Sequence, residues 1–468
     1  MNKLLALLWV IIIAGTAFIA IIIYKPEGSE EAEISPPIDK TLSGLYKEPS
    51  TKNEGKQPLQ IQEESPKTFA EYIAKGNTYF SEGYYEDAEK NYEKAAGLNT
   101  NSEESLKAQL GIVKAKINSR NIKDAKEILW TISDDSAETK YYKAIISILA
   151  KENEEAKKYF KEIVEAEKDK ETEEKTEFAQ KSQKFLDTFD IFSYYKEGDP
   201  LFLQLLLAKS LTETEENGAA IPLLFDILNQ KNNYHDAWIV LGYAFLNTNK
   251  AKEAVDALEQ AKDLNPDNPQ SLFYLGLAYF ADGKTKEAIH YLEEADEKGY
   301  EPKEHINLKL GDLYTLNTDF KKAAERYESV LAENQNNIDV FVRSVWLNLE
   351  KTNNPQKALK LAKLALENHQ GNPMSYNLVG WTYIALNDYE KAQENLSQAL
   401  SINKNFDAAW LNLGWMYEKQ GKTSLAKASY KKAYGLGKGG SIGNLAAIRF
   451  SKLTKQELKN FSVNISSP

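Results

Sequence analysis

The stretch WIVLGYAFLNTNKAKEAVDALEQAKDLNP, residues 238–266, decides the fold of this chain because its pattern returns further along the sequence. It comes back as LFYLGLAYFADGKTKEAIHYLEEA at 272–295, as YNLVGWTYIALNDYEKAQENLSQAL at 376–400 and as WLNLGWMYEKQGKTSLAKASYKKAY at 410–434. Recurrence at a fixed period of about 20 to 50 residues is typical of proteins that stack one supersecondary unit many times.

Small residues set the period of this repeat. Alanines recur with spacings of 34, 35, 35, 34 and 34 residues, at Ala254, Ala288, Ala323, Ala358, Ala392 and Ala426. Twelve residues before most of them stands a glycine, at Gly242, Gly276, Gly311, Gly380 and Gly414, whereas Trp346 takes that place in one divergent unit. The repeat unit is therefore 34 to 35 residues long.

Within one unit the apolar residues follow a helical spacing twice. Leu241 and Phe245 stand four residues apart on a first helix, and the alanine at 254 begins a similar series on a second. Gly242 and Ala254 then mark the point where the two helices cross closely, because a larger side chain would push the backbones apart. The small residues are predicted to serve packing.

This combination of an aromatic residue, Leu-Gly, a second aromatic residue, then Ala, Leu, Ala and Pro resembles the tetratricopeptide-repeat (TPR) family. The resemblance implies an all-α fold in which each unit is a pair of antiparallel helices. Stacked units would form a solenoid, a right-handed superhelix with a concave groove.

The repeat extends over most of the chain. Clear units cover 235–268, 269–302, 304–337, 339–372, 373–406 and 407–440, with two more at 69–102 and 201–234 and two degenerate ones within 106–164. We therefore expect an N-terminal TPR and TPR-like region at 69–199, a C-terminal TPR array at 200–440 and a capping helix and tail at 441–468. The stretch from the charged run EAEKDKETEEKTE at 165–177 through the apolar FLDTFDIFSYY at 185–195 is predicted to join two sub-arrays as a long exposed helix. The alternative is a dedicated binding insert.

The N-terminus carries a different signal. Residues 4–24 contain no charge, and a helix of that length matches the apolar thickness of a bilayer, so residues 1–25 are predicted to be a transmembrane anchor. A cleaved signal peptide, the alternative, has a shorter apolar core. Residues 26–66 hold five prolines among charged and small residues and predict a disordered linker. The basic residue Lys3 favours a cytoplasmic N-terminus with the repeats outside.

Composition excludes several classes of function. The chain has a net charge of −11, which is unsuited to broad contact with nucleic-acid phosphates, and it has no cysteine, which excludes thiolate nucleophiles and sulfur-based zinc sites. The four histidines lack metal-ligand spacing, and the glycines from Gly435 to Gly440 follow a repeat helix and not a strand. We expect no enzyme, no cofactor and no metal site.

The resemblance places the fifth, ninth and twelfth residues of each unit on the concave face of its first helix. The predicted protein-binding groove residues are Ile239, Tyr243, Phe273, Leu277, Phe280, Leu308, Asp312, Arg343, Leu347, Asn377, Trp381, Ile384, Leu411 and Trp415. Most are apolar or aromatic, and Trp is enriched among binding hot spots, so Trp381 and Trp415 are the leading anchors for a peptide. The alternative is that superhelical winding buries these residues against neighbouring units.

The sequence thus predicts a non-catalytic, membrane-anchored scaffold that binds proteins or peptides in its groove and does not bind nucleic acid. The expected location is a bacterial-type inner membrane with the TPR domain extracytoplasmic, in cell-envelope assembly or complex organisation. One alternative is a cytoplasm-facing adaptor that presents substrates to a membrane protease or synthase. The other is a TPR-containing enzyme, which needs a separate catalytic domain. The partner and the oligomeric state are left open.

Overall fold

The computed structural model describes residues 66–98, 101–171, 175–194, 199–437 and 440–454. In these ranges the chain forms 22 helices and no strand, as the all-α prediction requires. None of these helices is long and apolar enough to span a lipid bilayer. The predicted anchor at 4–24, and all but the last residue of the predicted linker, lie outside the described residues.

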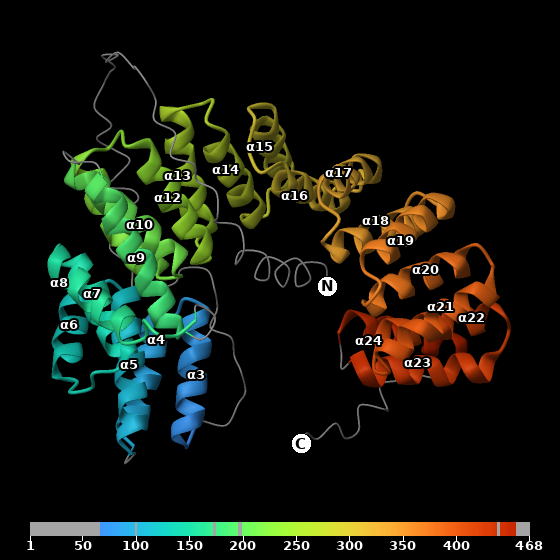
Figure 1. Ribbon diagram of the computed structural model, residues 1–468, viewed down its shortest axis with the longest axis horizontal. Helices are drawn as coiled ribbons and strands as arrows, with labels where there is room; N and C mark the ends of the chain where they lie inside the picture. Colours follow the sequence, from blue (N-terminus) through green and yellow to red (C-terminus); the bar gives the residue numbers. More distant parts are fainter. Residues whose placement is uncertain (1–65, 99–100, 172–174, 195–198, 438–439, 455–468) are drawn as a thin grey trace. The chain divides into compact units, whose positions relative to one another are not determined.

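The chain divides into two compact units, a first unit at Met1–Asp282 and a second unit at Gly283–Pro468 (Figure 1). The helices of the first unit are α3 (Phe69–Ser81), α4 (Tyr85–Ala96), α5 (Ser102–Asn118), α6 (Ile122–Thr131), α7 (Ala137–Leu149), α8 (Asn153–Glu165), α9 (Glu177–Tyr194), α10 (Pro200–Glu213), α11 (Asn217–Gln230), α12 (His235–Asn247), α13 (Ala251–Leu264) and α14 (Pro269–Ala281). Those of the second unit are α15 (Thr285–Glu297), α16 (Lys303–Leu316), α17 (Phe320–Glu333), α18 (Ile338–Glu350), α19 (Pro355–Asn368), α20 (Pro373–Ala385), α21 (Tyr389–Ile402), α22 (Asp407–Lys419), α23 (Thr423–Gly437) and α24 (Ser441–Thr454).

Each predicted repeat begins a helix pair at the expected place, and the turn inside the pair has one recurring backbone feature. The fifteenth residue of the unit has a positive φ, a left-handed conformation that glycine and asparagine adopt at little cost. Gly421 at +71° and Asn387 at +62° are examples. The sequence therefore specifies where the chain reverses between the two helices of a unit.

The repeated glycines lie where the two helices of a unit cross, as predicted. A Cβ atom added to Gly242 would stand 2.4 Å from the Leu258 side chain, and one added to Gly414 would stand 2.5 Å from the Tyr430 ring. These distances are shorter than van der Waals contact allows. Only glycine permits the first helix to approach the large apolar residue of the second.

Helix α11 is packed on two sides. Ten of its 14 residues are buried, and it contacts α10 and α12 as well as α5 and α7 from the N-terminal hairpins. Gly218 lies so close to α5 that an added Cβ would meet the Asn118 side chain, and the Arg120 guanidinium lies 5.2 Å from the centre of the Phe225 ring. The boundary expected between residues 199 and 200 therefore lies inside the first unit, because α11 joins the hairpins on either side of it.

The connecting helix predicted for the stretch 165–195 forms over its apolar part, as α9, but not across the charged run 165–177. Helix α8 ends at Glu165, α9 begins at Glu177, and the described residues between them form turns. The Glu167 carboxylate accepts hydrogen bonds from the backbone and hydroxyl of Thr176, which closes this loop. A short charged segment without an apolar stripe has no packing to stabilise a helix in water.

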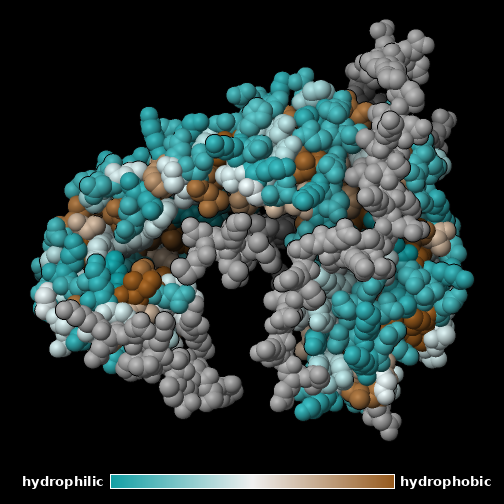
Figure 2. All heavy atoms as spheres, turned by 180° about the vertical axis from the view of Figure 1, so that it is seen from behind, coloured by the Kyte–Doolittle hydropathy of each residue, from teal (hydrophilic) through white to brown (hydrophobic). Residues whose placement is uncertain are grey.

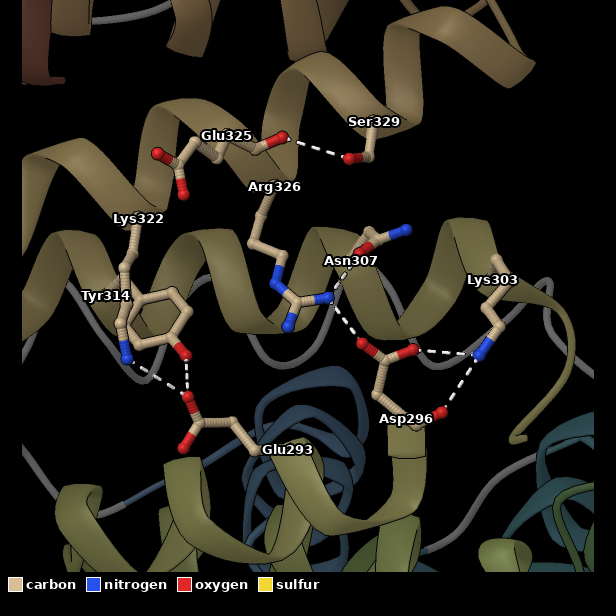
Figure 3. A network of polar contacts seen from close by, with 9 residues as sticks. All are labelled: Glu293, Asp296, Lys303, Asn307, Tyr314, Lys322, Glu325, Arg326 and Ser329. Atoms are coloured by element: carbon tan, nitrogen blue, oxygen red, sulfur yellow. Dashed lines mark hydrogen bonds and ion pairs between the residues drawn. The ribbon is translucent and has the colours of Figure 1, made fainter. Parts of the chain in front are cut away.

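A polar network links α15, α16 and α17 in the second unit (Figure 3). The Asp296 carboxylate accepts hydrogen bonds from Lys303 and Arg326, and Arg326 also donates to Asn307 over 2.9 Å. Beside it, Glu293 accepts a hydrogen bond from the Tyr314 hydroxyl. One hairpin is thereby fixed to the next by hydrogen bonds as well as by apolar packing.

This network predicts a dependence of stability on pH. Although burial acts to raise the pKa of Asp296, hydrogen bonds from Lys303 and Arg326 hold it below the usual 3.8. A lowered pKa in the folded state contributes stability above the unfolded-state pKa, and that contribution is lost as the pH falls through the folded-state pKa. Asp296→Asn should therefore lower the urea midpoint at neutral pH, with a difference from wild type that shrinks as the pH falls below about 4. If wild type and Asp296→Asn differed in urea midpoint by the same amount at neutral pH and below about pH 4, this assignment of Asp296 would be contradicted.

The C-terminal end of the repeats departs slightly from expectation. The glycines expected to follow the last repeat helix lie partly inside it, because α23 continues through Gly435 to Gly437. Helix α24 then packs on α23 and α22 and buries Ala446 and Phe450. It covers the apolar end of the last hairpin. Figure 2 shows hydrophilic residues over much of the visible surface, with hydrophobic ones among them.

Candidate functional site: the face of the first helices

The fifth-position residues of the predicted groove are mostly buried. Ile239 is only 5% exposed and Phe273 is also 5% exposed, because the first helices of successive units contact one another, as α12 does with α14. The groove residues that are buried in the structure are Ile239, Phe273, Leu347, Asn377, Ile384 and Leu411. These six residues are buried, as the alternative of burial against neighbouring units predicted. Their side chains therefore cannot make the first contact with a partner.

The remaining eight groove residues keep part of their surface exposed: Tyr243, Leu277, Phe280, Leu308, Asp312, Arg343, Trp381 and Trp415. The first three belong to the first unit, where the Tyr243 ring lies 5.3 Å from the Tyr274 ring. Burial raises the pKa of the Tyr243 hydroxyl, which stays protonated at neutral pH. The other five belong to the second unit, where they line its first helices α16, α18, α20 and α22.

Asp312 and Arg343 form an ion pair between α16 and α18. The Arg343 guanidinium donates to both oxygens of Asp312, at 2.8 and 3.0 Å, and the Tyr327 hydroxyl donates to the same carboxylate over 2.7 Å. Burial lowers the pKa of the neighbouring Lys309, with Asp312 opposing the shift and Arg343 adding to it. This part of the face is charged and internally paired, and it differs from the apolar stripe that the sequence suggested.

An amide pair continues the face between α20 and α22. The side-chain amide nitrogen of Asn412 donates a hydrogen bond to the side-chain amide oxygen of Asn377 over 2.9 Å. Both residues are buried. The two helices are therefore held in register by a polar contact. Asn377 stabilises the face and does not present a free amide to a ligand.

Trp415 is the best defined aromatic residue of the face. One side of it packs against the cluster formed by Ile384, Leu396 and Met416. The Lys419 ammonium lies 5.6 Å, and the Arg449 guanidinium 5.2 Å, from its ring centre, in the range of cation–π attraction. The indole is thus held in one orientation with part of its surface exposed.

Sequence reasoning missed the cations around Trp415. Lys419 stands four residues after Trp415 on the same helix, a spacing that could have indicated the contact. Arg449 comes from α24, 34 residues further on, and only the packing of the capping helix brings it near. The two cations therefore come from two elements, α22 and α24.

A polar cavity of about 200 Å³ lies in the first unit, beside the N-terminal end of α11. Lys114 and Glu216, two of its charged lining residues, have partners in the same unit. Lys114 pairs with Glu138 at 2.6 Å, and the Tyr142 hydroxyl lies 3.3 Å from Glu216. Burial raises the pKa of Glu216, and nearby lysines oppose the shift. These contacts connect α5 with α7, and α7 with the residue that precedes α11, and have the character of an internal junction.

No catalytic arrangement was expected, and the described residues contain no group of three or more His, Asp or Glu side chains that could hold a metal ion. The partly exposed features of this face in the second unit are aromatic and paired charged groups. Such groups suit recognition of a polypeptide.

Family models of the tetratricopeptide repeat match residues 205–302, 380–421 and, in a third form, 72–102 and 407–436. No curated protein was found to match the sequence. Among solved structures, the C-terminal part of a TPR repeat-containing protein from Cytophaga hutchinsonii is 14% identical with a TM-score of 0.43, and the match covers 52% of this chain and 98% of that one.

Two further solved structures are similar over more of this chain. The Cut9–Hcn1 hetero-tetramer of APC/C is 15% identical, with 82% of this chain and 76% of that chain covered and a TM-score of 0.38. Yeast Tom70 is 13% identical, with 85% and 99% covered and a TM-score of 0.31. The family models and the helix pairs lead to one conclusion: this chain carries tetratricopeptide repeats in both of its compact units.

Proposed function

We propose that this protein is a non-catalytic scaffold that holds partner proteins on the first-helix face of its second unit. The observation that carries the proposal is the Trp415 site, where a half-buried indole is fixed between an apolar cluster and two cations. An oriented aromatic side chain loses little conformational entropy on binding, which is why Trp is frequent in hot spots. Trp381, at the same position on the preceding first helix, offers a second anchor.

The membrane anchor remains part of the proposal and rests on the charge-free residues 4–24. We propose that these residues fix the protein in a bacterial-type inner membrane with the repeats extracytoplasmic, where the scaffold would serve envelope assembly. The cytoplasm-facing adaptor is the competing arrangement. Protease added to intact spheroplasts would cleave an extracytoplasmic repeat domain and spare a cytoplasmic one.

The Trp381→Ala/Trp415→Ala double variant is expected to lose specific partners. After crosslinking and affinity purification of the membrane-bound chain, the yield of partner proteins should fall by at least about tenfold, because truncation of hot-spot aromatics commonly costs about 2 kcal/mol or more. Circular dichroism would verify that the variant is folded.

Trp130→Ala is the matched control, because Trp130 is 42% exposed on α6 of the first unit and also lies beside a cation, Lys126. It should leave the partner yield unchanged. An unaltered set of partners in the double variant would reject the second-unit face as the binding surface.

A further inference from the structure

The C-terminal end of the repeats differs in charge from the rest of the molecule. Every charged residue from Lys419 to Thr454 is basic, eight in all, whereas the remainder of the chain has 50 basic and 69 acidic residues. Elsewhere in the second unit lysines meet carboxylates, as Lys357 meets Glu328 and Lys391 meets Asp388. Helices α23 and α24 contain no carboxylate of their own. Arg449 of α24 pairs with Glu418 of α22 at 3.8 Å, and the basic residues still outnumber the acidic ones at this end of the second unit.

The outer face of α24 is also apolar. Ser441, Leu445, Ile448 and Lys452 follow one another at helical spacing along this face, opposite the buried Ala446 side of the helix. Leu445 is 42% exposed and Ile448 is 64% exposed, which is high for large aliphatic side chains in a folded protein. Both side chains lie on the last helix of the described repeats.

Lysines flank this apolar face. Lys452 follows Ile448 by one helical turn and is exposed, and Lys432 is exposed on the adjoining helix α23. The Lys431 ammonium lies 5.5 Å from the centre of the Phe450 ring, which places it at the junction of α23 and α24. These exposed lysines and aliphatic side chains all belong to the last two packed helices, α23 and α24, and together we call them the terminal basic face: Lys431, Lys432, Leu445, Ile448 and Lys452.

We propose that the terminal basic face docks on a lipid surface rich in anionic headgroups. Single aliphatic side chains on a convex helix can enter the headgroup region, and lysines beside them are attracted to negatively charged lipids. A protein hot spot, in contrast, needs an anchor enclosed by its surroundings. The excess of positive charge supplies the complementarity to anionic lipid, and this surface is distinct from the side chains of Trp381 and Trp415.

The absence of cysteine permits a direct test in the full-length chain. Asn444 is exposed and adjacent to Leu445, so Asn444→Cys would carry an environment-sensitive fluorophore without removing the apolar side chains. The protein would be reconstituted in phosphatidylcholine vesicles with and without phosphatidylserine. A label at this position reports local contact with lipid regardless of how residues 4–24 behave. The same label at exposed Gln393→Cys on α21 serves as the positional control.

We expect a blue shift and increased intensity at position 444 only with phosphatidylserine, reversed by high salt, and no change at position 393. The Lys431→Glu/Lys432→Glu/Lys452→Glu variant should lower the ratio of lipid-bound to unbound label at position 444 by about a hundredfold or more. Each lysine near an anionic surface raises the binding constant by about fivefold, and the variant removes three of them. The charge-matched Lys321→Glu/Lys360→Glu/Lys363→Glu variant alters exposed lysines elsewhere in the second unit and should behave like wild type.

Three results would overturn the proposal: an unchanged label, a shift of equal size on neutral vesicles, or a response to polyglutamate without a response to anionic vesicles. The last would assign the terminal basic face to an acidic protein partner. Partner capture through Trp381 and Trp415 is a separate measurement, so failure of either proposal can be recognised without the other.

Discussion

Replacing Phe225 with alanine is expected to destabilise the first unit by about 3–5 kcal/mol, the usual cost of removing a large aromatic side chain from a core. Phe225 is 2% exposed and lies on α11, the helix that packs on both α12 and the N-terminal helices α5 and α7. Loss of its ring leaves a cavity and removes the surface over which Arg120 lies. The effect should therefore spread to hairpins distant in sequence.

Hydrogen exchange followed by mass spectrometry would measure this effect locally, because a chain with two compact units need not unfold in a single step. Amides of α5, α7 and α12 should exchange faster in Phe225→Ala, while those of α20 and α22 keep the wild-type rate. Asp226→Ala is the control on the same helix. Its partner Lys151 is about half exposed, so the loss of that ion pair should cost less than about 1 kcal/mol. Unchanged exchange in α5 and α7 would argue against the coupling through α11.

Gly414→Val should destabilise the C-terminal hairpin by about 3 kcal/mol. A Cβ at this position would stand 2.5 Å from the Tyr430 ring. Tyr430 lies on α23 and is fully buried against α22 and α24. The ring cannot withdraw without opening the core around Ala426 and Phe450. The helices must separate instead, and the orientation of Trp415 beside Arg449 would be lost with them.

Gly435→Val is the matched control for Gly414→Val. Apart from its chain neighbours and the nearby backbone of α23, no atom lies within 4 Å of a Cβ built at Gly435, which stands near the end of that helix. Valine there should be neutral or slightly stabilising, because glycine is the poorer helix former. Urea denaturation followed by circular dichroism would compare the two variants. Equal stability of both would show that the glycine at the helix crossing is not needed for close packing.

The positions of the helix pairs could be predicted from the sequence because the repeat encodes them locally. Gly242, Leu258 and the turn residue Asn249 recur as a set, and each is explained by contacts inside its own unit. The double packing of α11 could not be predicted from the period, since α5 and α7 lie about a hundred residues earlier. One signal was present: IPLLFDIL in α11 has seven apolar residues and one charge, Asp226, and so wide an apolar surface is typical of a helix buried on more than one side.

The candidate site was predicted less completely than the fold. Resemblance placed the fifth and ninth positions on one face, but it could not tell which of them the neighbouring unit covers. Ile239 and Phe273 are covered by contacts between first helices, whereas Trp381 and Trp415 keep exposed surface. The cation Arg449 depends on the docking of α24, which has no counterpart in the repeat pattern.

Site-specific photocrosslinking tests the central proposal most directly. A photoreactive phenylalanine analogue placed at Trp381 or Trp415 of the membrane-bound protein should form adducts with a partner protein in cells. The same analogue at Trp130 on α6, or at exposed Ile402 on α21, should not. Adducts restricted to positions 381 and 415 are the result expected for a scaffold that binds through the second-unit face. Adducts at positions 130 or 402 with none at 381 and 415 would contradict it.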